Sequence, residues 1–328
     1  MKTDAYNTIK DALKDTPEQT ICIKNHGTQE QHILHPQQFT LQPAGKGHID
    51  IFPLYEGIEL SFHRYLAASV HAHHIPQPHI LEINYCRQGR IGWSMGKDTN
   101  VYLGSSDLCI HSLACCADSK MTLPLGYYEG IAITIDLQSY QTKHLPIIAE
   151  TAVNLDQLYE RYCGPDKKPI RFSHPWIQSV FSQMFTSPLT SSLPYFQLKC
   201  IELLFYLIEI EEQAPALSCS REQSEQIRAI HQFLIEHIDQ RFTIEELAKR
   251  YLMNTSSLKT AFKAVYGMPI AAYMKEYRLQ LAAQLLKESE MSINEIAEYI
   301  GYESQGKFTK AFKARMQRLP TQYRKERH

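Results

Sequence analysis

Hydrophobic and polar positions alternate over short distances between about His48 and Asp136. Apolar runs there are separated by turn residues, as in the segment 87–90, and this is the pattern of strands. The predicted strands are Ile58–Tyr65, Ile80–Cys86, Ile91–Met95, Val101–Leu103, Leu108–His111 and Gly130–Ile135. Several short strands at this spacing favour an antiparallel barrel or sandwich over a parallel sheet.

The period lengthens to that of helices after Asp136. Helices are predicted over 153–161, 176–185 and 195–212, and a short one over 6–14 precedes the strands. The helix over 195–212 is apolar on more than one face, so it is either enclosed within its own domain or shared with a second subunit. Pro215, Ser218 and Ser220 then indicate a linker over 213–223.

The last hundred residues contain one helical pattern twice, about fifty positions apart, and each copy has the layout of a helix-turn-helix. Each copy opens with a capping box, in which a hydroxyl residue precedes a Glu by three positions. The boxes are Thr243 with Glu246 and Ser292 with Glu295. Two small helical units suit two adjacent grooves of a duplex, so the repeat indicates DNA binding.

The second helix of each copy, the reading helix, presents short polar and long basic side chains on its exposed face. Gln pairs with adenine edges, and Lys pairs with guanine or phosphate. The candidate DNA-binding residues are Ser256, Ser257, Lys259, Thr260 and Lys263 in the first copy, and Ser304, Gln305, Lys307, Thr309, Lys310 and Lys313 in the second. Thr255 or Ser256 is the predicted cap of the first reading helix.

A long amphipathic helix, predicted over 270–286, joins the two copies. Its roughly seventeen residues span about 25 Å at about 1.5 Å per residue. With the packed units at its ends, this length is compatible with two successive major grooves about 34 Å apart.

The net charge differs between the repeat, from Glu222 onward, and the rest of the chain. The whole sequence carries 34 Lys and Arg against 35 Asp and Glu, a net charge of −1. From Glu222 onward there are 17 Lys and Arg against 13 Asp and Glu, about +4, which leaves about −5 for the rest. Excess positive charge on the repeat suits phosphate binding.

Apolar composition argues against export and membrane insertion. No apolar run follows Met1, and no stretch of about 18 apolar residues occurs, so we expect a cytoplasmic protein with no membrane partner. The eight cysteines are scattered without a Cys-x-x-Cys motif, and a reducing compartment leaves them as thiols.

The repeat resembles the DNA-binding part of the AraC/XylS family of bacterial transcription regulators, over about residues 222–328. The second copy carries Ile293, Ile296-Ala297, Gly301-Tyr302, Ser304-Gln305, Phe308, Phe312-Lys313, Pro320 and Tyr323-Arg324. The first copy carries Ile244, Leu247-Ala248, Leu258, Phe262-Lys263, Gly267 and Tyr273. The resemblance implies a homodimer that contacts DNA bases through the reading helices and has RNA polymerase as a further partner.

Two positions depart from the family pattern. Leu252 stands where the second copy has Gly301, and Gln317 stands where a glycine is expected after the second reading helix. We therefore expect a strained or altered turn at each and unequal DNA affinity in the two copies.

The strand-rich part resembles the cupin-type barrel common in such regulators, and the run 82–136 resembles the pyochelin-regulator branch. This resemblance implies a small-molecule effector, for example a siderophore-like one. Tyr65, Tyr85 and Trp93 are the candidate effector-binding residues, with ordinary barrel core as the alternative interpretation.

Histidines cluster near the middle of the strand-rich part. They are His71, His73, His74 and His79, with His63 and His111 nearby in sequence. Imidazoles held close together in a barrel can bind iron or zinc. The alternative is a polar loop, since Pro76 and Pro78 interrupt the segment. No carboxylate stands at a convincing partner position, so we predict no metal and no other cofactor.

The sequence predicts an α+β protein of two domains, an antiparallel cupin-like β-barrel with following helices and an all-α double helix-turn-helix. The expected parts are a sensor over 1–140, a helical dimerisation region over 141–212, a linker over 213–223 and a DNA-binding domain over 224–328. The predicted function is that of a ligand-responsive, sequence-specific transcription activator and not an enzyme. One alternative is a constitutive regulator whose barrel only dimerises, and another is a metal-dependent cupin-type sensor or enzyme tethered to DNA.

Overall fold

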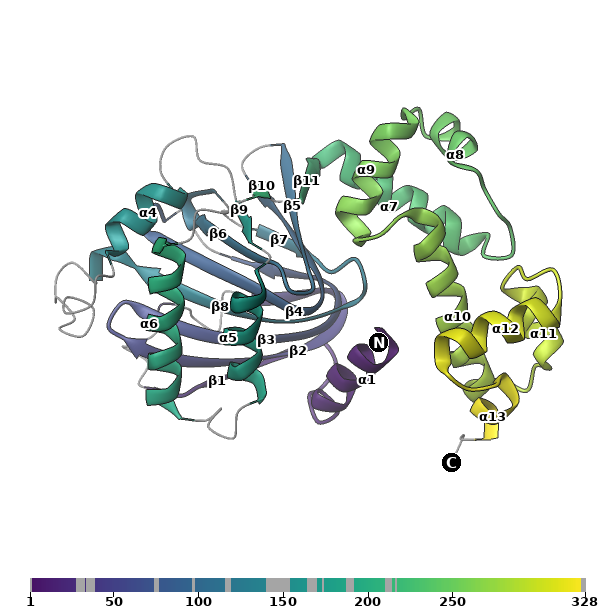
Figure 1. The fold of residues 1–328 in the computed structure, drawn as a ribbon, viewed down its shortest axis with the longest axis horizontal. Coiled ribbons are helices and arrows are strands. Elements are labelled where there is room, and N and C mark those ends of the chain that lie inside the picture. The colour runs from purple at the N-terminus through teal and green to yellow at the C-terminus, as the bar shows by residue number, and fades with distance from the viewer. Residues whose placement is uncertain are drawn as a thin grey trace. The chain divides into compact units, whose positions relative to one another are not determined.

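The chain folds as two units, Met1–Arg221 and Glu222–His328. The computed structural model (Figure 1) describes residues 2–27, 33, 39–73, 77–95, 98–115, 119–139, 154–163, 170–172, 174–186, 192–209, 214–215 and 217–325. No helix among these residues is long and apolar enough to cross a membrane.

The first unit is an antiparallel β-barrel preceded by helix α1, Lys2–Ala12. Its main strands are β1 Thr20–Asn25, β2 Phe39–Tyr55, β3 Ile58–Ala72, β4 Ile80–Met95, β5 Thr99–Gly104, β6 Leu108–Ser112, β7 Ser119–Thr122 and β8 Tyr127–Asp136. Both β7 and β8 pair with β3 and with β4, so these four strands close a ring. All pairs are antiparallel except that of β1 with β2.

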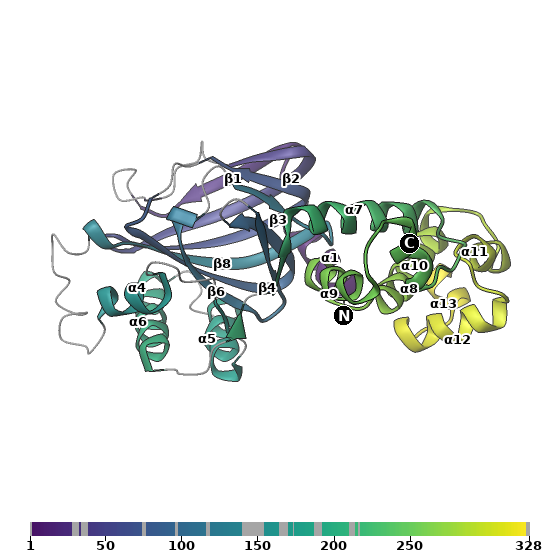
Figure 2. The same ribbon diagram turned by 90° about the horizontal axis from the view of Figure 1, so that it is seen from above.

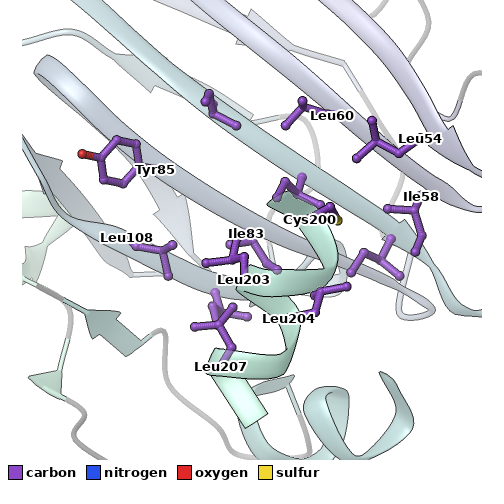
Figure 3. Packing of buried hydrophobic residues seen from close by; sticks show 14 of the residues in the cluster. Leu54, Ile58, Leu60, Ile83, Tyr85, Leu108, Cys200, Leu203, Leu204 and Leu207 are labelled. Carbon is purple, nitrogen blue, oxygen red and sulfur yellow. The ribbon is translucent and has the colours of Figure 1, made fainter. Parts of the chain in front are cut away.

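The two faces of the barrel wall bury different sets of side chains, because successive residues of a strand point to opposite sides. The outer face packs Leu60, Ile83 and Ile133 against helices α4 (Leu155–Cys163), α5 (Pro175–Thr186) and α6 (Leu193–Glu209). Figures 1 and 2 show these helices on one side of the sheet, and Figure 3 shows the packing of α6 on it. The inner face packs residues such as Ile49 and Val101 together.

The segment predicted as a linker, 213–223, contributes strands to the first unit. β10, Ala214–Pro215, pairs with β9, Ile170–Phe172. β11, Leu217–Ser220, pairs with β5 over four residues. The chain therefore enters the second unit from the edge of the sheet at Arg221, whose backbone N–H donates to the carbonyl oxygen of Asp98 at 2.9 Å.

The second unit is all helical. Its helices are α7 Arg221–Glu236, α8 Ile244–Arg250, α9 Thr255–Tyr266, α10 Ile270–Glu288, α11 Ile293–Tyr299, α12 Gln305–Met316 and α13 Pro320–Lys325. In Figure 1, α10 runs between the two small groups of helices that the repeat predicts. The second group closes on α10 through a core of Leu279, Leu286, Ile296, Phe308 and Phe312, each at most 1% exposed.

His231 of α7 is held against the first group. Its ring stacks on Tyr266 with centroids 4.6 Å apart, and its Nε2 lies 2.8 Å from the hydroxyl of Tyr273. Burial lowers the pKa of His231 to about 4, since the charged imidazolium loses its hydration there. The side chain is therefore neutral in the folded protein at pH 7.

We expect the free energy of unfolding to fall as the pH drops from about 6.5 to about 4, because His231 then takes up a proton in the unfolded state only. The loss is about 2 to 3 kcal/mol. Urea denaturation at pH 7 and pH 4.5 measures it. Burial also lowers the pKa of His63 in the first unit to about 4, so the informative quantity is the difference between wild type and His231→Phe. Equal pH dependence in the two proteins would contradict the assignment.

Candidate nucleic-acid interface

Each copy of the repeat opens with the capping box that the sequence predicts. The hydroxyl of Thr243 accepts from the backbone N–H of Glu246 at 3.1 Å, and the carboxylate of Glu246 accepts from the N–H of Thr243 at 2.7 Å. Ser292 and Glu295 repeat the arrangement at 3.1 and 2.6 Å. These hydrogen bonds, chiefly those from the backbone, lower the pKa of both Glu carboxyls. The prediction of α8 and α11 is confirmed.

The cap of the first reading helix, α9, is Asn254 and not Thr255 or Ser256, so that prediction is wrong by at least one residue. The Asn254 Oδ1 accepts from the backbone N–H of Ser257 at 2.7 Å. Asn reaches the third amide of a helix as readily as Ser or Thr does, and the sequence offers all of these types in succession. Ser304 caps the second reading helix, α12, by accepting from the N–H of Lys307 at 3.3 Å.

The structure leaves most of the candidate DNA-binding residues of α9 and α12 exposed and buries the aromatic rings of both helices. Phe262, Phe308 and Phe312 are completely buried. Exposed candidates are Ser256, Lys259, Thr260, Lys263, Ser304, Gln305, Lys307, Lys310 and Lys313, whereas Ser257 and Thr309 are half-buried. Ser304 uses its hydroxyl in the cap, and Lys307 is paired with Glu303.

Most of the positive charge of the two reading helices is carried by lysines that have no ion-pair partner in the described chain. Lys259, Lys263, Lys310 and Lys313 are exposed and form no ion pair with any residue that the structure describes. Uncompensated exposed lysines on a helix face favour contact with phosphates.

Gly306 is a further residue of this surface that the sequence analysis did not single out. It lies in the first turn of α12, is exposed, and a Cβ at this position would meet nothing within 4 Å. A glycine inside a helix costs about 1 kcal/mol relative to alanine. Packing within the chain does not require it, so the position leaves room for a close approach from outside. A glycine directly after a candidate base-contacting residue, Gln305, is the signal that could have revealed it.

The turns of the two copies take the same backbone conformation with different residues. Leu252 and Gly301, in the turns before the reading helices, have φ of 53° and 76°. Gly267 and Gln317, which follow the reading helices, have φ of 80° and 59°. The left-handed region costs an L-residue roughly 1 to 2 kcal/mol. Each copy therefore has one glycine and one strained residue, as the sequence predicts for Leu252 and Gln317.

Gly301 is required for a second reason, which Leu252 does not share. A Cβ on Gly301 would lie 2.4 Å from the carbonyl oxygen of Asp239, in the segment after α7. Leu252, in contrast, is 93% exposed.

Two pairs of hydrogen bonds, one of them within an ion pair, connect α10 to its neighbours. Arg278 donates from Nε to the carbonyl oxygen of Ile238 at 2.9 Å and from a terminal nitrogen to that of Gln240 at 2.5 Å. Two residues earlier in α10, Glu276 accepts two hydrogen bonds from Arg315 of α12, at 2.6 and 2.5 Å. Paired contacts of this kind between guanidinium and carboxylate restrict geometry as well as adding energy.

We expect Leu252→Gly to raise the free energy of unfolding by up to about 1 kcal/mol, because the relief of left-handed strain exceeds the added entropy of the unfolded chain. Gly301→Ala should lower it by about 2 to 4 kcal/mol, because its Cβ meets Asp239 and the backbone is strained as well. Chemical denaturation of the three proteins provides the comparison. Equal losses in both variants would show that the turns are equivalent.

The candidate effector residues do not share one site. Tyr65 and Trp93 lie on the inner face of the barrel, whereas Tyr85 lies on the outer face. The ring of Tyr85 stacks on Phe181 of α5 with centroids 4.2 Å apart. Tyr65 donates to or accepts from His63 Nδ1 at 2.8 Å.

The candidate histidines are dispersed. His71 and His73 lie together with ring centroids 4.1 Å apart, and His79 lies 3.9 Å from Asp136. His63 and His111 are inside the barrel, and His74 lies outside the described residues. No group of three or more His, Cys, Asp or Glu in the described part of the chain is arranged to hold a metal ion.

The chain matches the helix-turn-helix domain family over residues 247–326. It is 34% identical over 98 residues to the regulatory protein SoxS of Salmonella typhimurium, which covers 30% of this chain and 92% of SoxS. It is 35% identical over 105 residues to the HTH-type transcriptional regulator AlkR of Acinetobacter baylyi, or 32% of this chain and 33% of AlkR.

A third relative is the virulence regulon transcriptional activator VirF of Yersinia enterocolitica. It is 32% identical over 129 residues, which are 39% of this chain and 48% of VirF. The chain thus matches a third to a half of the length of AlkR and VirF, and nearly all of SoxS.

Proposed function

Because this chain belongs to the AraC/XylS family of DNA-binding transcription regulators, we propose that it places α9 and α12 in two successive major grooves and activates transcription in response to a small molecule. The observation that carries the proposal is the doubled unit itself. Both reading helices bury their aromatic rings and leave polar and basic side chains exposed. α10, with 19 residues, spans about 28 Å between the copies.

The second copy is proposed as the stronger reader of sequence. Gln305 is exposed next to Gly306, so its amide can approach an adenine edge closely. Lys310 and Lys313 lie on the same exposed face. The first copy, with Lys259 and Lys263 as exposed cations near Ser256 and Thr260, is proposed to add mainly phosphate contacts.

Gln305→Ala and Lys310→Ala should each weaken binding to a DNA fragment from upstream of the protein's own gene by about 1 to 3 kcal/mol where a base is read. If Lys310 contacts only phosphate, its replacement should instead reduce the slope of log Kd against log salt concentration by about one. Footprinting and salt titration measure both effects. Lys10→Ala, which makes the same charge change in α1, is the matched control and should bind as wild type does.

Gly306→Ala is a further variant for the same experiment, in which the stability of α12 and DNA binding should change in opposite directions. Alanine should stabilise α12 by about 1 kcal/mol yet weaken DNA binding, because its methyl group fills the space proposed for DNA. Footprints that stay unchanged in Gln305→Ala, Lys310→Ala and Gly306→Ala would contradict the assignment of α12.

Activation is proposed because VirF, a relative over the shared region, is a transcriptional activator. An activator bound upstream of a promoter contacts RNA polymerase, which we propose as a further partner. Transcription from the same fragment should therefore fall in the variants that lose DNA binding. A rise in transcription would identify a repressor instead.

A homodimer is proposed from the outer side of α6. Leu198 and Phe205, two turns apart on this helix, are 64% and 48% exposed. Large apolar side chains on one face of a helix mark interaction surfaces when they occur together. The pairing of α6 with the same helix of a second copy would bury this face.

Phe205→Glu should therefore shift the protein from dimer to monomer, since a carboxylate cannot be buried in an apolar interface without a large desolvation cost. Size-exclusion chromatography with light scattering measures the mass. Tyr299→Glu, at an aromatic residue 52% exposed on α11, controls for the loss of an exposed ring. A wild-type monomer, or a Phe205→Glu dimer, would contradict the proposal.

A further inference from the structure

The segment that joins α7 to α8 lies between the two copies of the repeat. Arg278, the ninth of the 19 residues of α10, donates to the carbonyl oxygens of Ile238 and Gln240 in this segment. Since α10 joins the copies, these hydrogen bonds hold the segment near the middle of the unit. The backbone of Asp239 also abuts the turn at Gly301, as Figure 1 shows. The segment therefore contacts the second copy at the turn that leads into α12.

Arg241 of this segment lies near the start of α12. The pKa of the Glu303 carboxyl, in the turn before α12, is lowered by the hydrogen bond from Lys307 first, and also by the charges of Lys307 and Arg241. Burial raises the pKa of Tyr302, and the charges of Arg278 and Arg241 oppose that rise. Neighbouring charges change a pKa mainly at short range. Both effects agree with the backbone contact and place Arg241 beside the turn.

The side chain of Arg241 is available to a partner outside the chain. It is exposed and forms no hydrogen bond or ion pair with any residue that the structure describes. Arg278 is bound to backbone carbonyls, and Lys307 is paired with Glu303. Together with the carboxylate of Asp239, this region has three positive and two negative side chains. Its net charge is positive, so the partner that suits Arg241 is an anion.

We infer that Arg241 enters the minor groove of DNA between the two major grooves that α9 and α12 occupy. The inference rests on the proposed function. One minor groove separates two successive major grooves on the same face of a duplex, and Arg241 lies between the two copies. A narrow minor groove, typical of A·T-rich DNA, has an enhanced negative potential that attracts arginine. The protein should therefore prefer A·T pairs at central positions that neither reading helix contacts.

Three DNA fragments test this preference with the full chain. Each carries the two protected segments of the native site, and the central base pairs between them are A·T, I·C or G·C, where I is inosine. Inosine lacks the amino group that guanine places in the minor groove and keeps the major-groove acceptors of guanine.

Wild type should bind the A·T and I·C fragments about threefold or more tightly than the G·C fragment. Fluorescence anisotropy measures the affinities at one salt concentration. Equal affinity for the three fragments would overturn the inference. A preference for A·T over both I·C and G·C would show that the major groove is read there, which also overturns it.

Arg241→Ala should remove the preference, because the side chain that enters the groove is lost. The matched control is Arg228→Ala, at an exposed arginine of α7, which makes the same charge change and should keep the preference. A loss of affinity in Arg241→Ala that is equal on the three fragments would show a phosphate contact and overturn the inference.

The melting temperature of Arg241→Ala shows whether the fold is affected. It should stay within about 2 °C of wild type, because the side chain is exposed and unpaired in the described structure. A larger fall would assign Arg241 an internal role and overturn the inference.

Footprinting on the native site separates this inference from the proposed function. Two protected segments, with an affinity that does not depend on the central base pairs, contradict the inference alone. Absence of two protected segments contradicts the proposed placement of α9 and α12, and with it the inference.

Discussion

The geometry of the DNA-binding unit depends on how the segment after α7 is held by α10. The Arg278 guanidinium donates to the carbonyl oxygens of Ile238 and Gln240. Between these residues, the backbone of Asp239 lies so close to the turn at Gly301 that a Cβ there would clash with its carbonyl oxygen. Burial lowers the pKa of Arg278, yet an arginine stays charged in proteins. The same α7 packs on the first copy, where Arg250 lies 4.1 Å over the ring of Phe233. Helix α7 and the segment that follows it thus contact both copies and restrict their relative orientation.

The constraint explains why the two copies are unequal. The second copy has a glycine where Asp239 approaches, whereas the first turn is open to solvent and carries Leu252 despite its positive φ. The second copy also has the bidentate pair between Glu276 and Arg315. A rigid copy with Gln305 and a bare helix turn at Gly306 suits base reading, and a less constrained copy suits phosphate contact.

Local signals predicted the second unit well because its helices are set by short-range rules. Capping boxes, the amphipathic period of α10 and the turn positions all act within a few residues. The barrel was predicted less completely, because its strands are completed by distant partners. The short strand β1 is recognised only by its pairing with β2, and β11 only by its pairing with β5. The sequence therefore predicts a linker over 213–223, although this segment contributes strands to the fold.

The candidate effector residues show the same limit within one strand. Tyr85 and Trp93 are an even number of positions apart and so should share a face of β4. A β-bulge between Cys86 and Gln88 shifts the alternation by one residue and places Tyr85 outside and Trp93 inside. The position of Arg241 beside α12 likewise follows from contacts between distant segments, which no local pattern contains.

The two reading helices are proposed to occupy successive major grooves on one face of DNA. The most direct test of this placement is footprinting on the native site and on a site with about five base pairs, half a helical turn, inserted between the two protected segments. We expect two protected segments about 10 base pairs apart on the native site. After the insertion, one segment should lose its protection and the affinity should fall strongly. Unchanged affinity with both segments still protected would contradict this placement.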